Sequence, residues 1–343
     1  MIRVPAEFEQ QSFILIIFPH EHSDWIDYLE EARNCFVEIV NAIITYQKVV
    51  LICDDVTLVK SYFTVHHNIT FIKYLTDDTW ARDCSAISRY HVGAFCDNTK
   101  DTTLVDFTFN GWGGKFEASK DNLLTRSLGF QNSVQTLSHE LEGGAIESNG
   151  NGVLLTTSEC LLNPNRTAKS KSEVEHFLNQ VLGFTKFLWL DHGYLAGDDT
   201  DSHIDTLARF VDEETIMYVK CHDKNDEHYE ALSKMERQLK SFEGFRLIAL
   251  PMTNPIYHDE EYLDNDTVKI IQQRLPATYA NFLIINGAVL VPTYNDSHDK
   301  EVLAIFKAAF PYHDIIGIDC SVLIKQHGSL HCVTMQFAHG VSF

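Results

Sequence analysis

The 343-residue sequence has no long hydrophobic run. Its longest apolar stretch, Phe13 to Pro19, is far shorter than the roughly 20 residues that a membrane-spanning helix needs. The opening residues, MIRVPAEFEQQ, do not place a basic segment before an apolar one, as a secretory signal does. We therefore expect a cytoplasmic protein with no membrane partner.

Positive charge is also scarce. The chain has 27 Lys and Arg against 48 Asp and Glu, which gives a formal net charge of -21. Nucleic acids and anionic lipids would repel such a chain, so we expect neither as a partner. A small cationic substrate is compatible with this charge, because a negative field concentrates cations. An acidic surface that only maintains solubility explains the charge equally well.

Paired cysteines and metal-binding motifs are absent from the sequence. The eight cysteines form no Cys-x-x-Cys pair and lie mostly in apolar runs, which is typical of a reducing compartment. No His-Glu-x-x-His motif occurs, and no Cys/His spacing typical of zinc accompanies the histidines. We therefore predict no bound metal.

Helix-like and strand-like segments alternate five times along the chain. The predicted helices are 24–46, 117–128, 171–182, 225–242 and 298–309. The predicted strands that follow them are Lys48–Cys53, Val134–Leu137, Lys186–Leu190, Arg246–Leu250 and Asp314–Asp319. Hairpin-like strand pairs, such as 206–211 with 216–220, lie between them. We expect one α/β domain, residues 1–343. A radial arrangement with every post-helix strand near a common axis fits this pattern, and so does a doubly wound sheet.

Four motifs in the loops after these strands hold polar residues whose burial would be costly in free energy. They are TDDTWARD at 76–83, ELEGG at 140–144, GDDTDSHID at 197–205 and HGSLHC at 327–332. If the strands converge, these loops converge too. One cysteine, one or two histidines and several carboxylates would then share a pocket, which is the composition of a thiol-nucleophile site.

Each motif alone has a plainer explanation. An extended His203-x-Asp205 would direct both side chains to one side, but an Asp bonded to a core His is the commoner arrangement. Glu142-Gly-Gly is compatible with a turn whose glycines have positive φ. An isolated cysteine such as Cys332 is more often a buried hydrophobic residue than a nucleophile. The joint occurrence of the motifs favours an active site.

The motifs together resemble a known family. GDDTDSHIDTLARF, TWARD, LEGG, TTSECLLNPNR at 156–166 and the terminal GSLHC are similar to segments of the agmatine deiminases. Pro5-Ala-Glu-Phe and Phe18-Pro-His resemble that family's N-terminal signature. The agmatine deiminases are grouped with the bacterial peptidylarginine deiminases in the guanidine-modifying superfamily. The matched motifs run from about residue 5 to residue 336, nearly the whole chain.

The resemblance implies a five-bladed α/β propeller of ββαβ modules with pseudo-fivefold symmetry. It implies Cys332 as the nucleophile and His203 as the general acid and base. Asp83 and Asp205 would bind the substrate's guanidinium, and Glu142 would orient or bind it. The resemblance implies no metal and no organic cofactor.

The other end of the substrate separates agmatine, which ends in an ammonium, from arginine, which ends in a zwitterion. Asp199, with Asp198 and Asp201, could supply negative charge to an ammonium, and Trp80 or Trp112 could supply an aromatic face. Ser329 can donate a hydrogen bond, although the family often reads Gly-Gly-Gly-Asn-Ile-His-Cys at this place. A free-arginine site would need an arginine for the carboxylate, and Arg82 or Arg166 could serve, but we expect both to be structural.

We therefore predict an enzyme that hydrolyses agmatine to N-carbamoylputrescine and ammonia, with a homodimer as the expected assembly. A deiminase of free or peptidyl arginine is an alternative. A metal-dependent amidohydrolase using His203 and Asp205 as ligands is a second alternative, and a non-catalytic binder of guanidines or polyamines is a third. The role of His331 is open, because it could tune Cys332 or face the opposite side of the strand.

Overall fold

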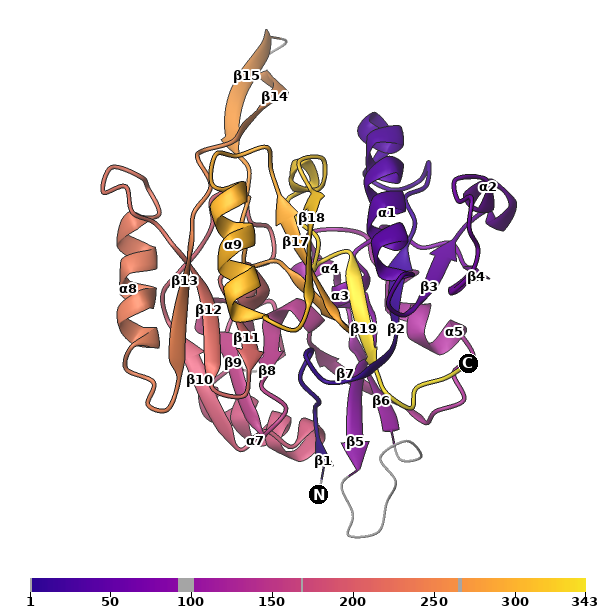
Figure 1. Ribbon diagram of the computed structural model, residues 1–343, viewed down its shortest axis with the longest axis horizontal. Coiled ribbons are helices and arrows are strands. Elements are labelled where there is room, and N and C mark those ends of the chain that lie inside the picture. Colours follow the sequence, from indigo (N-terminus) through magenta and orange to yellow (C-terminus); the bar gives the residue numbers. More distant parts are fainter. Residues whose placement is uncertain (1, 92–101, 168, 265–266) are drawn as a thin grey trace.

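The computed structural model describes residues 2–91, 102–167, 169–264 and 267–343 (Figure 1). The fold is mixed α/β and is built of several small sheets. In one of them β11 (Ala208–Asp212) pairs antiparallel with β12 (Thr215–Lys220). Helix α8 (Tyr229–Leu239) follows, and β13 (Arg246–Pro251) then lies parallel to β12. This order of strand, strand, helix and strand is the repeating unit of the molecule.

Three more sheets repeat the order. Their elements are β5 (Ile87–His91), β6 (Thr102–Thr108), α5 (Leu124–Ser127) and β7 (Val134–Glu140); β8 (Ile146–Ser148), β9 (Val153–Thr157), α7 (Lys171–Leu182) and β10 (Lys186–Leu190); and β16 (Leu283–Ile285), β17 (Ala288–Thr293), α9 (Asp299–Ala309) and β18 (Asp314–Asp319). In each, the first two strands are antiparallel and the post-helix strand is parallel to the second. The short strand β1 (Ile2–Arg3) pairs with β5.

The fifth sheet joins the two ends of the chain. C-terminal β19 (Thr334–Ala338) pairs antiparallel with β2 (Gln11–Ile17), and α1 (Leu29–Ile43) leads from β2 to the parallel strand β3 (Lys48–Cys53). A further helix, α2 (Val56–Ser61), leads to β4 (Ile69–Lys73), which is parallel to β3. The five predicted helix-to-strand modules are thus present.

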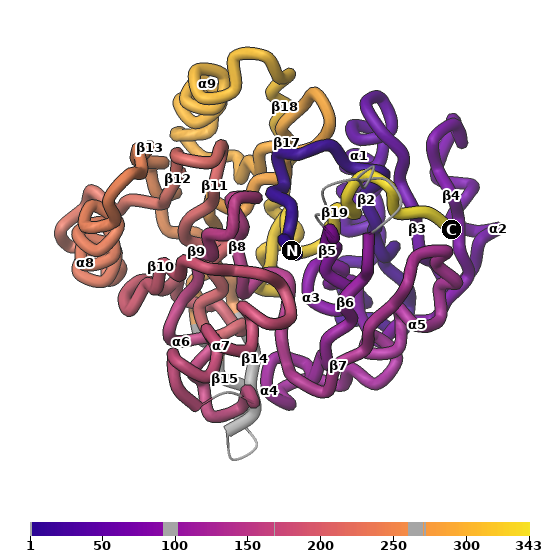
Figure 2. Tube along the Cα trace, turned by 90° about the horizontal axis from the view of Figure 1, so that it is seen from below, coloured from indigo at the N-terminus to yellow at the C-terminus, as the bar shows by residue number. Residues whose placement is uncertain are grey.

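The first strands of the sheets lie in the interior. All of β16 and all but one residue of β5, β8, β11 and β19 are buried, whereas most residues of β7, β13 and β18 are exposed or half-buried. The expectation that the post-helix strands lie nearest a common axis is therefore wrong. The first strand occupies one edge of the second strand. The post-helix strand therefore pairs with the other, outer edge of the second strand. Figure 2 shows the sheets following one another around the molecule, with α8 and α9 outside.

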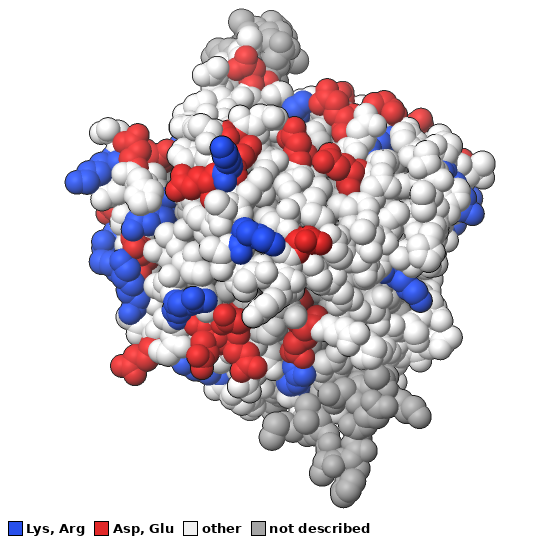
Figure 3. All heavy atoms as spheres, in the orientation of Figure 1, with Lys and Arg blue, Asp and Glu red and all other residues white. Residues whose placement is uncertain are grey.

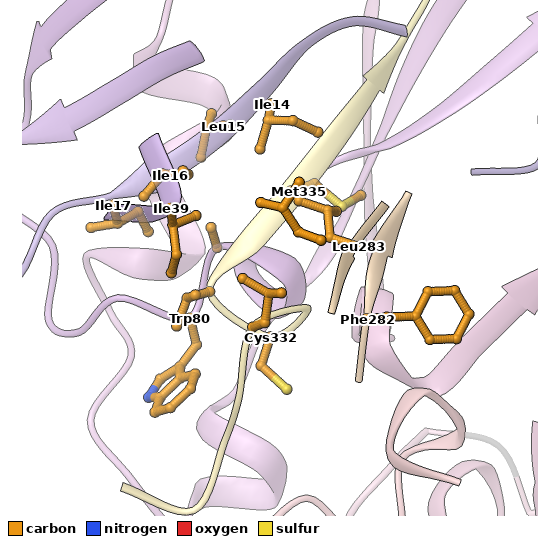
Figure 4. Close-up of a cluster of buried hydrophobic side chains, with 14 of the residues drawn as sticks. Ile14, Leu15, Ile16, Ile17, Ile39, Trp80, Phe282, Leu283, Cys332 and Met335 are labelled. Carbon is orange, nitrogen blue, oxygen red and sulfur yellow. The ribbon is translucent and has the colours of Figure 1, made fainter. Parts of the chain in front are cut away.

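The apolar core is continuous across much of the molecule. Residues Ile14–Ile17 of β2 are fully buried and pack in the same cluster as Ile39 of α1, Leu283 of β16 and Met335 of β19. Figure 4 shows these side chains close to Trp80 and Cys332. The helix faces follow the 3.6-residue period, because α1 buries Phe36, Ile39, Val40 and Ile43 on one side.

Helix boundaries follow the capping residues. The prediction 171–182 is confirmed at both ends, because Ser170 caps the first turn of α7 and Gly183, with φ of 82°, ends it. The predictions 24–46 and 225–242 extend too far, since α1 and α8 have no side-chain cap at their N-termini. Residues 117–128 hold only a 3-10 turn and the single-turn helix α5.

A hairpin projects from the body of the molecule (Figure 1). Its strands are β14 (Tyr257–Asp264) and β15 (Thr267–Arg274), paired antiparallel. The sequence pattern predicts no strand there, since His-Asp-Glu-Glu at 258–261 has low strand propensity. Figure 3 shows acidic and basic side chains interspersed on this face of the molecule. No helix in the described ranges is long and apolar enough to cross a membrane.

Candidate active site

The polar residues of the motifs lie on segments that enter the buried first strands. Asp83 precedes β5, Glu142 precedes β8, His203 and Asp205 precede β11, Asn281 precedes β16 and Cys332 precedes β19. These segments come together because buried first strands contact one another in the interior, as β5 does with β19 and β8 with β11. The loops therefore converge as predicted, but through the strands that they enter and not through the strands that they leave.

Cys332 is the centre of the cluster. It is 4% exposed, and its Sγ lies 3.3 Å from Asn281 Nδ2 and 4.0 Å from Asp205 Oδ2. Figure 4 shows its side chain beside Trp80, in the turn that leads into β19. Burial, and then the charges of Asp205 and Asp83, raise the pKa of this thiol well above its ordinary value. A thiol in these surroundings stays protonated unless a positive charge arrives nearby.

His203 is fully buried next to one of these carboxylates. Its Nδ1 lies 3.8 Å from Asp83 Oδ1, and neither ring nitrogen has a hydrogen-bond partner within standard geometry. Burial alone would lower its pKa, but Asp83, Cys160 and Glu142 raise it well above the ordinary value. His203 is therefore placed to be a protonated acid. The segment after it is a 3-10 turn, Ile204–Thr206, so the stretch His203-x-Asp205 is not extended.

The two aspartates differ in their surroundings. Asp83 Oδ1 accepts the Gly144 N–H at 2.9 Å and Oδ2 accepts Trp112 Nε1–H at 3.1 Å, while burial, Asp205 and Glu142 raise its pKa to about 6. Asp205 Oδ2 accepts from His331 Nδ1 at 2.7 Å, and its Oδ1 is buried without a hydrogen bond. Burial would raise the pKa of Asp205, but the bond and charge of His331 bring it below the ordinary value. An unpartnered ionised oxygen is thus available to a ligand's N–H groups.

Glu142 is held by an arginine. Its two carboxylate oxygens lie 2.8 Å from Arg166 Nη2 and 3.2 Å from Arg166 Nε, and both residues are buried. The following glycines do not have positive φ, which corrects the predicted turn geometry. They are required by close approach, because a Cβ on Gly144 would lie 2.5 Å from His203 Nδ1 and one on Gly143 would lie 2.3 Å from the Arg82 carbonyl.

A cavity of about 160 Å³ opens onto Cys332. Among the described residues its lining includes four carboxylates, the imidazole of His327 and no Lys or Arg, and its walls include Trp80, Trp112 and Phe116; the carboxylates are Asp24, Asp78, Asp83 and Asp199. Burial, and then Asp24 and Asp121, raise the pKa of Asp78 to about 8. A larger hollow of about 520 Å³ lies beside α8, but it contains neither the thiol nor the unpartnered atoms. The smaller cavity is therefore the candidate active site.

Of the predicted substrate contacts, Trp80, Asp83 and Asp199 line this cavity and Ser329 does not. The Ser329 hydroxyl is buried against Tyr294 Oη at 2.8 Å, which makes it part of the frame of the loop. His203, Asp205 and Glu142 form the buried layer that adjoins Asp83 and Cys332. Asp198 and Asp201 bond within their own loop or to Lys115 and Arg166.

Three site residues were missed from the sequence: Asp24, Asp78 and Asn281. Asn281 Oδ1 accepts the His331 N–H at 2.8 Å, and its amide lies against the Cys332 sulfur. The position of Asn281 at the start of a strand could have identified it, because the site residues of the four motifs also precede strands.

One group of buried side chains has the chemistry of a metal site. In the described part of the chain, ligand atoms of Glu142, Cys160 and His203 lie within 4.8 Å of one another. Arg166 pairs with Glu142 and its Nη2 lies 4.0 Å from Cys160 Sγ. A metal ion there would face that guanidinium at close range, so the group does not fit a cation.

Comparisons with known proteins agree with this geometry. The sequence profile of the Porphyromonas-type peptidyl-arginine deiminase family matches residues 3–337. An agmatine deiminase of Medicago truncatula is 30% identical, and the alignment covers 97% of this chain and 95% of that protein.

Solved structures are similar over the same length. The C. jejuni agmatine deiminase, in a cysteine-to-serine variant with substrate bound, is 40% identical, with a TM-score of 0.90 and coverage of 98% of this chain and 96% of that one. A Porphyromonas gingivalis structure with the provisional name arginine deiminase is 43% identical, with a TM-score of 0.89 and full coverage of both chains. The chain therefore belongs to the Porphyromonas-type peptidyl-arginine deiminase family.

Proposed function

We propose that this protein hydrolyses agmatine to N-carbamoylputrescine and ammonia through a covalent intermediate on Cys332. One observation carries the proposal: a buried thiol lies between two aspartates and opens onto a cavity whose described lining holds four carboxylates and no Lys or Arg. Such a site favours a cationic, planar substrate. Relatives named agmatine deiminase align over nearly the whole chain, which supports the same reaction.

Asp83 and Asp205 bind the guanidinium in this proposal. A guanidinium offers several N–H donors in one plane, and carboxylates on different nitrogens fix that plane by charge-assisted hydrogen bonds. The unpartnered Oδ1 of Asp205 supports its part in this contact. Glu142 is ion-paired with Arg166, whose Nε donates to its Oε2, while its Oε1 makes no hydrogen bond among the described residues, so Glu142 can orient or bind the guanidinium. The fixed plane presents the central carbon to Cys332.

The substrate also assists the ionisation of the nucleophile. The surrounding carboxylates raise the pKa of the Cys332 thiol, and only the thiolate attacks. A bound guanidinium adds the positive charge that offsets these carboxylates. Cys332 then loses its proton to solvent, and the amide of Asn281, 3.3 Å from Sγ, stabilises the thiolate.

The reaction then has two halves. The thiolate forms a C–S bond with the guanidinium carbon, and protonated His203 gives its proton to one nitrogen, so that the C–N bond breaks and ammonia leaves. An amidino group remains on Cys332. Neutral His203 next takes a proton from a water molecule as its oxygen bonds to carbon. The C–S bond then breaks, the remaining hydroxyl proton passes to solvent as the carbonyl forms, the thiolate returns, and the neutral ureido product leaves.

The lining of the cavity favours an ammonium at the other end of the substrate. Asp24 and Asp199 and the rings of Trp80 and Trp112 suit a cation, and a bound cation also favours the ionised form of Asp78, whose pKa is raised to about 8 by burial. A free-arginine carboxylate would meet these aspartates with His327 but without a Lys or Arg in the described lining. Arg82 pairs with Glu7 in the interior and Arg166 pairs with Glu142, so both serve structural roles.

Ammonia release tests the proposal. We would compare agmatine, arginine and an N-blocked arginine ester with wild type, Cys332→Ala and the control Cys221→Ala, which removes a buried thiol outside the site. Turnover of agmatine that only Cys332→Ala abolishes is expected. Turnover of the arginine compounds instead would overturn the substrate. Binding of agmatine without ammonia release would favour the non-catalytic binder, and undiminished activity of Cys332→Ala would exclude the cysteine mechanism.

We further propose that the sheets form a five-bladed propeller in one catalytic domain, residues 1–343. The repeated strand order, the buried first strands and the arrangement in Figure 2 support this. A homodimer and a cytoplasmic location are also proposed. The cysteines of the described ranges are all unpaired, in agreement with a reducing compartment. Sedimentation velocity would test the oligomeric state, since a monomer at micromolar concentration contradicts the dimer.

A further inference from the structure

A closed group of charged side chains lies in the interior beside the site. Each member is at most 5% exposed, and together they are Glu7, Arg82, Glu147, Asp205, Arg209 and His331. Arg209 Nη2 lies 2.9 Å from Glu7 Oε2 and its Nε lies 2.7 Å from Glu147 Oε2. Arg82 Nη2 lies 3.4 Å from Glu7 Oε2, and its Nε donates to the His331 carbonyl at 3.3 Å. His331 connects this group to Asp205.

Both ring nitrogens of His331 face carboxylate oxygens. Nδ1 lies 2.7 Å from Asp205 Oδ2 and Nε2 lies 2.7 Å from Glu7 Oε2. These oxygens accept, so each short contact requires an N–H on the ring. A proton on the contacting oxygen of either carboxyl would be the alternative, but against the effect of burial the surrounding cations hold the pKa values of Glu7 and Asp205 below their ordinary values, so both are ionised. The two contacts together with these charges therefore favour both protons on the imidazole.

Charge balance leads to the same result. The group holds three carboxylates, Glu7, Glu147 and Asp205, and two guanidiniums, Arg82 and Arg209. With all five ionised, a neutral His331 would leave one buried negative charge in excess, which is costly. An imidazolium makes three cations against three anions. Among the described residues, both ion pairs of His331, with Glu7 and with Asp205, lie within this set. Burial raises the pKa of Glu147, and His203 offsets part of the charge of Asp205, so the balance supports the geometric argument and does not replace it.

We propose that His331 is an imidazolium that acts as a positioning residue for Asp205. Its N–H holds Oδ2 of that carboxylate, so that the unpartnered Oδ1 is presented to the substrate's guanidinium. Its charge also keeps Asp205 ionised in a fully buried place, where a carboxylate would otherwise tend to protonate. This inference rests on the proposed function for the part that concerns substrate, but the charge of His331 stands without it.

Neutron diffraction from wild-type crystals at about pD 8 tests the charge directly. His228 is the internal control, because its Nε2 accepts the Ala196 N–H at 2.8 Å while its Nδ1 faces Asp226 at 2.8 Å, which fits a neutral ring. We expect deuterium on both nitrogens of His331 and on one nitrogen of His228. A single deuterium on His331 would overturn the proposal whether or not agmatine is the substrate.

Kinetics test the positioning role. We expect His331→Gln and Asp205→Asn each to lower kcat/KM for agmatine by roughly 10²-fold or more, since small misplacements of reacting groups have effects of this size. Because His331 acts through Asp205, the double variant should lose little beyond Asp205→Asn. Losses that multiply in the double variant would contradict the positioning role. If His331→Gln does not fold, His331→Asn takes its place.

A failure of the proposed function is recognised separately. If wild type releases no ammonia from agmatine, the proposed function is wrong. The neutron result would still decide the charge of His331. Agmatine binding, measured by calorimetry in wild type and His331→Gln, would then decide the positioning role. Equal affinities would overturn it, and a weaker affinity in the variant would support it.

Discussion

Cys332 and His203 lie near the same carboxylates, which raise the pKa of both groups. The free protein therefore holds a thiol beside an imidazolium. Many cysteine enzymes instead place the cationic histidine where it stabilises the thiolate. Here the missing positive charge must come with the ligand.

This arrangement predicts slow alkylation of Cys332 in the free protein at neutral pH. We expect the rate with iodoacetamide, followed by mass spectrometry of the peptide that contains Cys332, to keep rising as the pH increases beyond about 8.5, the ordinary thiol pKa. Cys332→Ser gives the background from the other cysteines. Rapid alkylation at pH 7 with a rate that does not change with pH would mean that the thiolate is already formed, and substrate-assisted ionisation would be wrong.

Asp83 gives a second prediction at this scale. Its pKa is raised to about 6, so the carboxylate becomes neutral as the pH falls through that value and loses its ion pair with the guanidinium. His203 remains protonated there, because its pKa lies well above its ordinary value. We expect kcat/KM for agmatine to fall about tenfold for each pH unit below 6. Asp83→Asn should have low activity, and its kcat/KM should not show this fall below pH 6. A fall that is unchanged in Asp83→Asn would mean that another group titrates.

The residues that could be predicted were those with distinctive chemistry. Cys332, His203, Asp205 and Asp83 lie in motifs that pair such groups with apolar runs, and the structure brings them together. Asn281 has no such mark, since an asparagine at the start of a strand is also common in turns. Glu7 was missed because a single carboxylate near the N-terminus does not indicate that it will be buried among Arg82, Arg209 and His331.

Among the elements, sequence signals were reliable where the chain specifies its own boundaries. Helix α7 was predicted to the residue because Ser170 and Gly183 cap it. Helices α1 and α8 begin without a side-chain cap, so their polar flanks extended the prediction. The order of strands was beyond reach, because hydrophobic pattern does not say which edge of a sheet is buried. That choice depends on contacts between segments far apart in the sequence.

The turn before β8 gives a prediction at the scale of an element. Gly144 donates to Asp83, and a Cβ there would overlap His203 Nδ1 at 2.5 Å and Asp83 Oδ1 at 2.9 Å. We expect Gly144→Ala to lower kcat for agmatine about 10²-fold by displacing these side chains. The matched control is Gly317→Ala in β18, whose Cβ would meet only side chains, the closest at 3.2 Å, and which should keep nearly full activity. Equal activities of the two variants would show that the close approach has no effect on the site.

At the scale of the molecule, the buried charges connect sheets that are separate in hydrogen bonding. Glu7 comes from the segment before β2, Glu147 from β8, Arg209 from β11, and Arg82 and His331 from the segments before β5 and β19. The Ile284 N–H of β16 also donates to Glu7 Oε1 at 2.7 Å. All five of the larger sheets therefore contribute to or adjoin one electrostatic group. An isolated ion pair is weak evidence for stability, but removal of one member of a buried group leaves the others uncompensated.

Glu7→Gln tests this connection. The variant removes the carboxylate that faces Arg82, Arg209 and His331, so we expect the free energy of unfolding in urea at pH 7 to fall by about 3–5 kcal/mol. The matched control is Glu230→Gln, whose exposed pair with Lys234 on α8 should have little effect.

The pH dependence of this difference adds a second test. Burial would raise the pKa of Glu7, but Arg209, His331 and Arg82 bring it below its ordinary value of about 4.3. A group with a lowered pKa stabilises the fold above that ordinary value, and its contribution disappears as the pH falls towards the lowered one. The difference between wild type and Glu7→Gln should therefore be largest at neutral pH and shrink under acid conditions. A difference that grows as the pH falls would mean that Glu7 is buried as a neutral acid, and the balance of three cations and three anions that supports a charged His331 would fail with it.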